Sequence, residues 1–299
     1  MPELPEVETV RRGLEPVLTG RRFHRVEQRR PDLRFPFPER FSTRLEGETV
    51  HTLTRRAKYL LAHLSSGEVL VMHLGMSGRF TIASPRGNGA GTPGVVLGEY
   101  IYETASNAKH DHVRFEMEGG GAVTYNDPRR FGYMLLLPGE TLEQHALFSG
   151  LGAEPLGNTL NAEYLAQKAR GRKTDLKAFL MDQRNIAGLG NIYVCEALHQ
   201  SGLSPAREAS CLATATGRPT IRTERLVTAI RAVLEKAILA GGSTLKDYRQ
   251  ADGSTGAFQE SFTAYGREGE PCVTPGCRGI VRRSVQAGRS TFYCAKCQR

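Results

Sequence analysis

Four of the six cysteines lie near the C-terminal end of the sequence, at spacings that suit a metal ion. Cys272 and Cys277 form a C-x4-C pair, and Cys294 and Cys297 form a C-x2-C pair sixteen residues later. Two close thiolate pairs separated by a hairpin-length stretch are typical of a tetrahedral zinc site that has no open position for water. The alternative is two disulfides, which a reducing compartment disfavours. We therefore expect one structural Zn²⁺.

The N-terminus offers a second kind of chemistry. Pro2 follows the initiator Met1, and removal of Met1 would leave a secondary amine on a rigid ring, with an ordinary pKa near 7.7–8.0. Such an amine can attack an electrophilic sugar carbon and form an iminium. The positive end of a helix predicted over residues 1–18 favours its neutral form, and Glu3 beside it could protonate a sugar oxygen. The alternative is an ordinary helix start without chemistry.

A glycine-rich turn could bind a phosphate. Gly188 and Gly190 directly precede a helix predicted over residues 191–201, so the backbone there can approach a ligand closely. Asn191 is a favourable N-cap residue, and the exposed N–H groups of that helix end suit an anion. The alternative is a helix–turn–helix pair that only packs.

The composition favours a polyanionic partner. The chain has 299 residues and a net charge of +9, and residues 272–299 contain six basic residues and no acidic one. Nucleic acid fits this charge first and an anionic membrane surface second; a basic solvated surface is the alternative. No apolar run approaches 18 residues, and Glu3, Glu6 and Glu8 argue against a secretory signal.

Periodicity divides the chain into a strand-rich and a helix-rich part. Short apolar or alternating runs between residues 23 and 137 predict an antiparallel sandwich or barrel, and residues 84–98 a surface loop. The predicted strands span 50–53, 59–64, 69–72, 113–115, 123–125 and 133–137, with a C-terminal hairpin at 280–281 and 291–293; the predicted helices after the first span 162–170, 175–183, 191–201 and 224–240.

Six motifs in this order resemble the bacterial formamidopyrimidine-DNA glycosylase family over nearly the whole chain. They are MPELPEVETV at the start, LGMSGRF after His73, DPRRFG at 127–132, GLGNIY at 188–193, YGREGEPC at 265–272 and the four cysteines. The resemblance implies an α+β multidomain fold. Its expected parts are an N-terminal β-sandwich flanked by helices over 1–137, a linker over 138–161, a helical domain with a helix-two-turn-helix over 162–264, and a zinc finger over 265–299.

The family resemblance also implies an activity. We expect a bifunctional base excision repair enzyme that removes 8-oxoguanine and formamidopyrimidines from double-stranded DNA and then nicks the strand by β,δ-elimination. It would need no redox or nucleotide cofactor, and it would act as a monomer in the bacterial cytoplasm. By resemblance, Pro2 is the nucleophile and Glu3 the proton donor, Lys58 grips phosphate and assists β-elimination, and Arg289 assists δ-elimination.

The DNA contacts are expected from the same resemblance. A damaged base must be turned out of the duplex before it can react, and a wedge of Met76, Arg129 and Phe131 would fill the gap. Arg129 could donate two N–H groups to the orphaned cytosine. The remaining expected contacts are His73, His110, Arg172, Asn191 and Tyr265 to the DNA backbone, and Ser243 and Tyr248 in the base pocket, under a loop over 246–262.

The sequence departs from the family pattern at four places. The first cysteine pair is C-x4-C instead of the usual C-x2-C, residue 77 is Ser where some relatives have Glu, and the stretches 84–98 and 205–223 are long. Two other functions stay open at this stage. One is a DNA-binding protein without catalysis, and the other is an oxidised-pyrimidine enzyme of the sister endonuclease VIII branch, although Leu4 and the wedge residues favour the purine branch.

Overall fold

The computed structural model describes residues 2–83, 95–97, 108–243 and 257–299. The chain forms two compact units, Met1–Ser149 with Ala240–Gln259, and Gly150–Leu239 with Glu260–Arg299. The domain boundaries expected from the sequence stay a prediction. Tyr248, most of the predicted 84–98 loop and most of the 246–262 loop lie outside the described residues.

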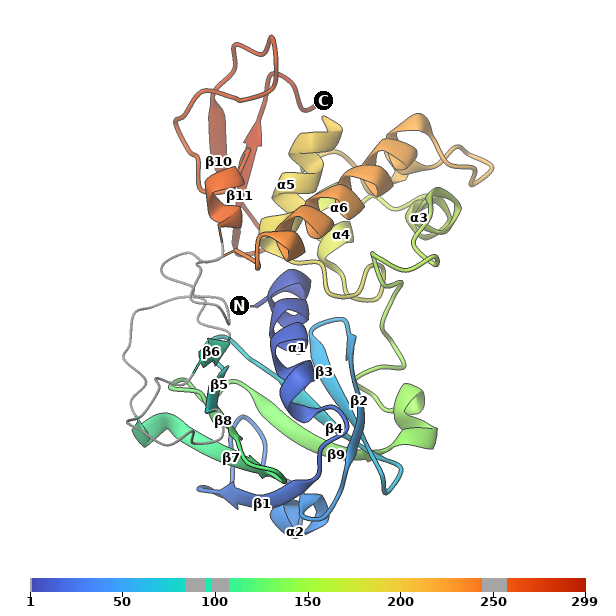
Figure 1. The fold of residues 1–299 in the computed structure, drawn as a ribbon. Coiled ribbons are helices and arrows are strands. Elements are labelled where there is room, and N and C mark those ends of the chain that lie inside the picture. Colours follow the sequence, from blue (N-terminus) through green and yellow to red (C-terminus); the bar gives the residue numbers. More distant parts are fainter. Residues whose placement is uncertain (1, 84–94, 98–107, 244–256) are drawn as a thin grey trace. The chain divides into compact units, whose positions relative to one another are not determined.

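The first unit contains two antiparallel sheets and an N-terminal helix (Figure 1). One sheet has the strand order β1-β7-β8-β5-β6 and the other has the order β2-β3-β4-β9. The elements are α1 (Leu4–Leu18), β1 (Phe23–Gln28), α2 (Phe41–Leu45), β2 (Val50–Arg56), β3 (Tyr59–Leu64), β4 (Glu68–His73), β5 (Arg79–Ala83), β6 (Val95–Leu97), β7 (Asp111–Met117), β8 (Ala122–Asn126) and β9 (Tyr133–Pro138), with short 3-10 turns at Ala108–His110, Gly139–Gln144 and Phe258–Ser261.

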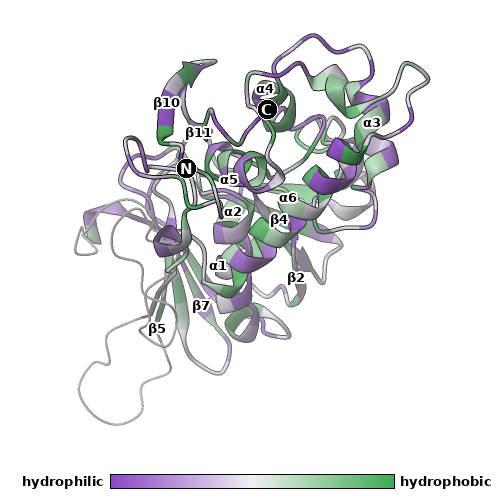
Figure 2. Cartoon of the chain, turned by 90° about the horizontal axis from the view of Figure 1, so that it is seen from above, coloured by the Kyte–Doolittle hydropathy of each residue, from purple (hydrophilic) through white to green (hydrophobic). Residues whose placement is uncertain are grey.

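One hydrophobic core holds this unit together. Val7, Val10 and Leu14 recur at three- and four-residue steps on α1 and are buried, whereas Arg12 and Glu15 are exposed, so that apolar and polar residues alternate along the helix (Figure 2). They join buried residues from both sheets, such as Leu60 of β3 and Phe115 of β7, in a single cluster. Each fully buried aliphatic or aromatic side chain contributes roughly 1.5–3 kcal/mol. The predicted antiparallel sandwich is therefore confirmed.

Two neighbouring connections cross from one sheet to the other. Residues 74–78 lead from β4 to β5, and residues 127–132 lead from β8 to β9. Strand β4 pairs with β9, and β5 pairs with β8. Because both ends of the two connections are paired in this way, residues 74–78 and 127–132 must lie side by side.

The second unit is helical and ends in a β-hairpin. Helix α5 packs against α6 and against hairpin strand β11, and it ends at Gly202, whose φ of 70° is the left-handed conformation that glycine adopts without cost. The elements are α3 (Ala162–Ala169), α4 (Leu176–Met181), α5 (Asn191–Ser201), α6 (Ile221–Leu239), β10 (Val281–Gln286) and β11 (Arg289–Cys294), with a 3-10 turn at Ala209–Leu212.

The helices were predicted better than the strands. Helix α5 has the predicted bounds, and α6 begins at Ile221, three residues before its predicted start. Strands β1 and β5 were missed, because β1 buries only Phe23 and Val26 and because β5 follows a glycine-rich turn. The prediction of a loop over 84–98 is wrong at 95–97, which form strand β6 because they pair with β5. None of the described helices combines the length and the hydropathy needed to cross a membrane.

Candidate functional site

The start of α1 is held by two carboxylates. Glu3 is the N-cap, and the Glu3 backbone N–H donates to Oε2 of Glu6 at 2.8 Å, which completes a capping box. Pro2 and Glu3 are both buried. The geometry thus fixes the backbone of the expected nucleophile and proton donor relative to the helix axis.

Glu6 has a second task that the sequence did not reveal. Its other oxygen, Oε1, accepts hydrogen bonds from the Ser243 backbone N–H at 2.8 Å and from the Ser243 hydroxyl at 2.9 Å. Gly242, at φ +87°, lies so close that an added Cβ would be 3.2 Å from the Glu6 side chain. Ser243, expected in the base pocket, therefore anchors its segment to the N-terminal helix.

A chain of charges connects α1 to the turn that carries Lys58. Glu8 accepts from Arg11 of the same helix and from Arg55 of β2, with the Arg55 contact at 3.3 Å. Burial raises the pKa of Glu8, but hydrogen bonds from Arg11 and Arg12 outweigh it and lower the pKa. Arg55 also donates to the carbonyl of Ala57 at 2.9 Å, next to Lys58, which is 8% exposed. Lys58 thus occupies a turn that is tied to the N-terminal helix.

His73 lies at the end of β4 in an aromatic cluster. Its ring stacks on Tyr133 with centroids 5.0 Å apart and lies 5.1 Å from the Tyr59 ring. Burial and the positive charges of Lys58 and Arg34 lower its pKa to about 4, so the ring is neutral at physiological pH. Nδ1 accepts the Gly75 N–H at 3.0 Å, which assigns the ring proton to Nε2. His73 can therefore offer a neutral N–H donor.

This pKa gives a testable pH dependence. The folded state disfavours protonation of His73, so its stabilising effect is complete above the unfolded pKa of 6.5 and is lost as pH falls toward about 4. When the pH falls from 7.5 to 5, the free energy of unfolding should decrease by about 1–2 kcal/mol less in the His73→Gln variant than in the unchanged chain. Urea denaturation at both pH values measures this; parallel losses would contradict the assignment.

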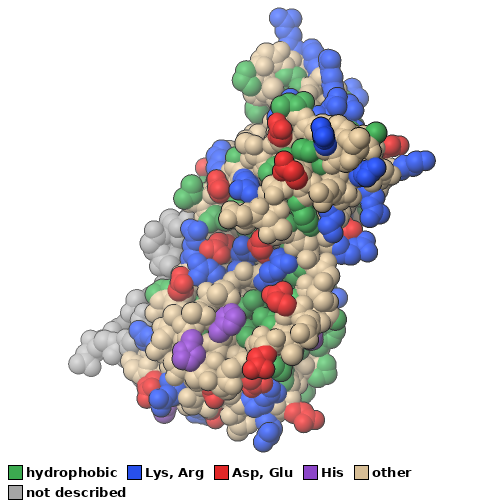
Figure 3. All heavy atoms as spheres, turned by 90° about the vertical axis from the view of Figure 1, so that its right-hand side faces the viewer, with side chains coloured by type: hydrophobic (Ala, Val, Ile, Leu, Met, Phe, Trp, Pro, Cys, Tyr) green, Lys and Arg blue, Asp and Glu red, His purple; other side chains and the backbone are tan. Residues whose placement is uncertain are grey.

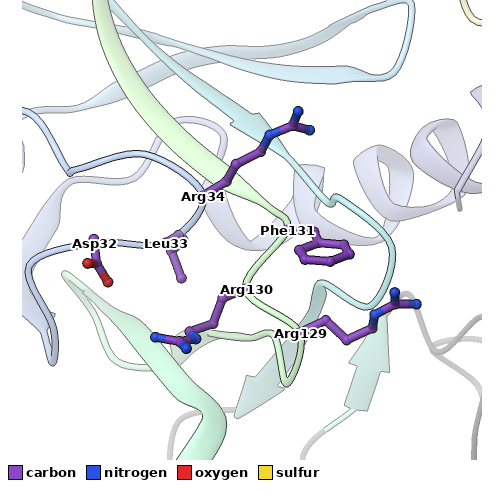
Figure 4. A pocket seen from close by; sticks show the side chains of 6 residues that line it. All are labelled: Asp32, Leu33, Arg34, Arg129, Arg130 and Phe131. Carbon is purple, nitrogen blue, oxygen red and sulfur yellow. The ribbon is translucent and has the colours of Figure 1, made fainter.

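The three expected wedge residues lie on the two adjacent crossover connections. Met76 is half-buried, whereas Arg129 and Phe131 are exposed. The Arg129 guanidinium stands 4.7 Å from the centroid of the Phe131 ring. A hollow of about 550 Å³ opens beside them, and the Arg129 and Arg130 side chains leave the loop in opposite directions, Arg130 toward Asp32 (Figure 4). The structure thus brings the whole expected wedge together.

Asn191 does not have its expected role as N-cap. The N-cap of α5 is Gly190, and no side chain caps this end. Asn191 is instead the first residue inside the helix, and its side-chain Nδ2 donates to the carbonyl of Ser290 at 3.0 Å. The expectation of an Asn191 cap is wrong, although a phosphate contact from the turn stays a proposal.

Lys177 is a second donor to the same carbonyl, and no pattern in the sequence indicated it. Its side chain is 1% exposed, and Nζ donates to the Ser290 carbonyl at 3.2 Å and to the Thr291 hydroxyl at 2.7 Å. Arg289, the neighbour of Ser290, is exposed and follows a two-residue turn in which Ala287 and Gly288 both have positive φ. The hairpin end that presents Arg289 is therefore fastened to α4 and α5.

Tyr265 is positioned by a buried glutamate of α5. Glu196, 2% exposed, accepts the backbone N–H groups of Thr263, Ala264 and Tyr265 at 2.7–2.9 Å. The Tyr265 ring packs edge-on against Phe292 of β11, with centroids 5.0 Å apart. Of the other expected DNA contacts, Arg172 is exposed, and His110 is half-buried in the 3-10 turn before β7.

The four C-terminal cysteines converge around one point. Their sulfur atoms all lie within 4.8 Å of one another, and the Cys272–Cys297 and Cys277–Cys294 distances are both 3.7 Å. These distances are too long for disulfides, and the cysteines are free. A tetrahedral Zn²⁺ with bonds near 2.3 Å would separate its sulfurs by about 3.8 Å. The donor set can therefore hold a metal ion and fits zinc.

The thiols of the cluster have different acidities, since the pKa of Cys272 is lowered whereas burial raises the pKa of Cys297 to about 12. Burial raises the pKa of Cys272, but hydrogen bonds with Thr274 and His199 outweigh it and lower the pKa to about 6. Gly279 is required beside the cluster, since an added Cβ would lie 2.5 Å from the Cys294 sulfur.

On the face drawn in Figure 3, Lys and Arg side chains are prominent, with acidic side chains interspersed. The charge on this face is therefore mixed.

Comparison with known proteins gives two family matches. Residues 1–134 match the formamidopyrimidine-DNA glycosylase N-terminal domain, and residues 151–249 match the formamidopyrimidine-DNA glycosylase H2TH domain. A formamidopyrimidine-DNA glycosylase from Azorhizobium caulinodans is 60% identical over 299 residues and aligned over the full length of both chains. One from Methylobacterium nodulans is 58% identical and covers 100% of this chain and 99% of its own.

Solved structures show the same likeness. The MutM (Fpg) protein from Thermus thermophilus is 37% identical, with a TM-score of 0.78 and coverage of 99% of this chain and 98% of its own. A mutant of the Lactococcus lactis Fpg, solved in complex with a Fapy-dG containing DNA, is 31% identical, with a TM-score of 0.81 over both whole chains.

Proposed function

The chain belongs to the formamidopyrimidine-DNA glycosylase family, and we propose that it performs the family's reaction through Pro2, Glu3, Lys58 and Arg289. As a member, it is a base excision repair DNA glycosylase and AP lyase that acts on oxidised purines. The assignment of residues rests on the start of α1, where Pro2 and Glu3 are buried and a capping box holds the backbone.

The first step is displacement of the damaged base. The neutral Pro2 nitrogen, freed by removal of Met1, attacks the anomeric carbon; the glycosidic bond breaks, its electron pair leaves with the base, and the base takes up the proton that the amine nitrogen loses. Glu3 protonates the sugar ring oxygen as the ring opens and the iminium forms. The positive end of α1 supports the neutral form of the amine, and the capping box holds it in place.

Strand cleavage follows from the iminium. Its positive charge acidifies the neighbouring sugar hydrogens, so the 3′ phosphate and then the 5′ phosphate can leave. Lys58 grips the phosphate next to the lesion and assists the first elimination. Arg289, exposed at the tip of a fastened hairpin, contacts phosphate and assists the second.

The remaining assignments concern the DNA and the metal. We assign phosphate contacts to His73, His110, Arg172, Asn191 and Tyr265, and base-pocket contacts to Ser243 and Tyr248. The four cysteines hold one structural Zn²⁺, which stabilises the hairpin that carries Arg289. The protein acts as a monomer in the cytoplasm, where bacterial DNA is found.

The wedge assignment makes a specific prediction. Arg129→Ala removes two donors to the orphaned cytosine, so the preference for 8-oxoguanine opposite cytosine over adenine should fall about tenfold or more, since one good bidentate contact contributes roughly 1–3 kcal/mol of discrimination. Single-turnover excision from the two duplexes measures the ratio. Arg130→Ala is the matched control, and an unchanged ratio in Arg129→Ala would refute the fork contact.

Borohydride trapping tests the reaction itself. Reduction of the iminium should join the chain covalently to DNA that contains 8-oxoguanine. A protein that only recognises damaged DNA would bind the duplex and give no adduct. An oxidised-pyrimidine enzyme would be trapped faster on thymine glycol than on 8-oxoguanine opposite cytosine, and this result would reject the purine assignment.

A further inference from the structure

Asp127 is a fully buried carboxylate at the start of the crossover connection that carries Arg129 and Phe131. Oδ1 accepts the Ser77 hydroxyl at 2.5 Å, and Oδ2 accepts the Gly132 N–H at 2.8 Å and the Tyr125 hydroxyl at 3.2 Å. A buried carboxylate destabilises a fold unless such donors surround it. Burial of Asp127 therefore requires all of these donors, and the reaction proposed above does not use its carboxylate.

Ser77 extends this contact to the other connection. Its hydroxyl donates to Asp127 and also accepts the backbone N–H of Arg129 at 3.2 Å. Ser77 is the direct neighbour of Met76, and Gly132, the other partner of the carboxylate, is the direct neighbour of Phe131. The carboxylate thus bonds directly to a residue next to Met76 and to one next to Phe131, and it is linked to the Arg129 backbone through Ser77.

The two connections are also in direct contact at Gly75, and Gly132 packs against the end of β8. A Cβ on Gly75 would lie 2.3 Å from the carbonyl carbon of Phe131, and one on Gly132 would lie 1.8 Å from the Tyr125 hydroxyl. Contacts this close transmit a shift of one connection to the other. A displacement of residues 74–78 should therefore also displace residues 127–132.

We propose that Asp127 and Ser77 together fix the position of Arg129 relative to Met76 and Phe131. This pair, called the relay below, thereby determines how strictly the base opposite the lesion is recognised. The proposal rests on the wedge role proposed above. Neither residue touches DNA in this account. Ser77 acts through the backbone of Arg129, and Asp127 acts through Ser77 and Gly132.

Loss of the relay should affect discrimination more than catalysis. A bidentate contact depends on the exact placement of the guanidinium, whereas cleavage of a preformed abasic site depends on Pro2, Glu3, Lys58 and Arg289 and does not use the wedge. Ser77→Ala should lower the cytosine-over-adenine excision ratio by about tenfold and leave abasic-site cleavage within about threefold of the unchanged chain. Ser77→Thr, which retains the hydroxyl, should restore the ratio, and Asp127→Asn should resemble Ser77→Ala.

The control variant is Glu46→Gln. Glu46 accepts the Val26 backbone N–H at 2.9 Å in the same unit, so its loss weakens a comparable carboxylate–backbone contact far from the wedge in sequence. Single-turnover excision opposite cytosine and adenine is measured for all variants, together with thermal unfolding. Glu46→Gln should lower the unfolding temperature without changing the excision ratio.

The outcomes are distinguishable. A normal ratio in Ser77→Ala and Asp127→Asn, with a reduced ratio in Arg129→Ala, overturns the relay and keeps the wedge. A normal ratio in Arg129→Ala overturns both. An excision ratio that falls equally in Glu46→Gln, or that Ser77→Thr does not restore, shows general loosening of the unit and also overturns the relay.

Discussion

Replacing Pro2 by glycine should lower the rate of 8-oxoguanine excision by a factor on the order of 10³. The pyrrolidine ring fixes φ and presents the nitrogen in one orientation, whereas a terminal glycine samples many orientations. Much of the advantage of a bound nucleophile comes from such fixed placement. The remaining primary amine would react, but from a poorly defined position.

Binding should survive this change. The affinity for a duplex with a tetrahydrofuran abasic analogue, which cannot form an iminium, should stay within about threefold, because phosphate contacts dominate DNA affinity. Pro5→Ala is the matched control: it alters the first turn of α1 and leaves the terminal ring intact, so excision should be nearly normal. Full excision by Pro2→Gly would defeat the assignment of the nucleophile.

Replacing Cys294 by serine should release the metal and unfold the C-terminal hairpin. Cys294 is fully buried, and a two-stranded hairpin is at best marginally stable by itself in water. The free energy of zinc binding in small fingers, roughly 10–16 kcal/mol, is the free energy that folds them. Without it, the exposed Arg289 would lose its fixed position.

Three measurements check this prediction. Bound zinc should fall from one equivalent to none, affinity for the tetrahydrofuran duplex should fall at least about tenfold, and cleavage products should shift from β,δ- to β-elimination. Cys211→Ser is the matched control, since Cys211 lies outside the cluster and should retain zinc. A zinc-free variant with full affinity would refute the structural role.

Local patterns of residue type and spacing predicted much of the fold. The 3.6-residue period predicted α5 with its observed bounds, and the spacing of the four cysteines predicted their convergence. Both signals lie within short stretches, where side-chain type and spacing decide the outcome. The strand β1 was missed, because it buries only two apolar residues and its polar positions gave no alternation to detect.

The positioning carboxylates and the buried lysine could not be predicted from such patterns. Glu6 accepts from Ser243 at a separation of 237 residues, and Lys177 donates to Ser290 at a separation of 113. Glutamate and lysine on helices are ordinarily solvated, so their residue types suggest a surface role. Asn191 also has a partner that its residue type did not indicate, since its side chain donates to a carbonyl 99 residues away and the N-cap is Gly190.

The central claim is that the terminal imino nitrogen of Pro2 bonds to deoxyribose. The most direct measurement is mass analysis of the borohydride-trapped complex, followed by mapping of the cross-linked peptide. The account predicts a chain without Met1 that carries the DNA remnant on the Pro2 nitrogen. A fully active chain that retains Met1, or a remnant attached to a lysine such as Lys58, would contradict it.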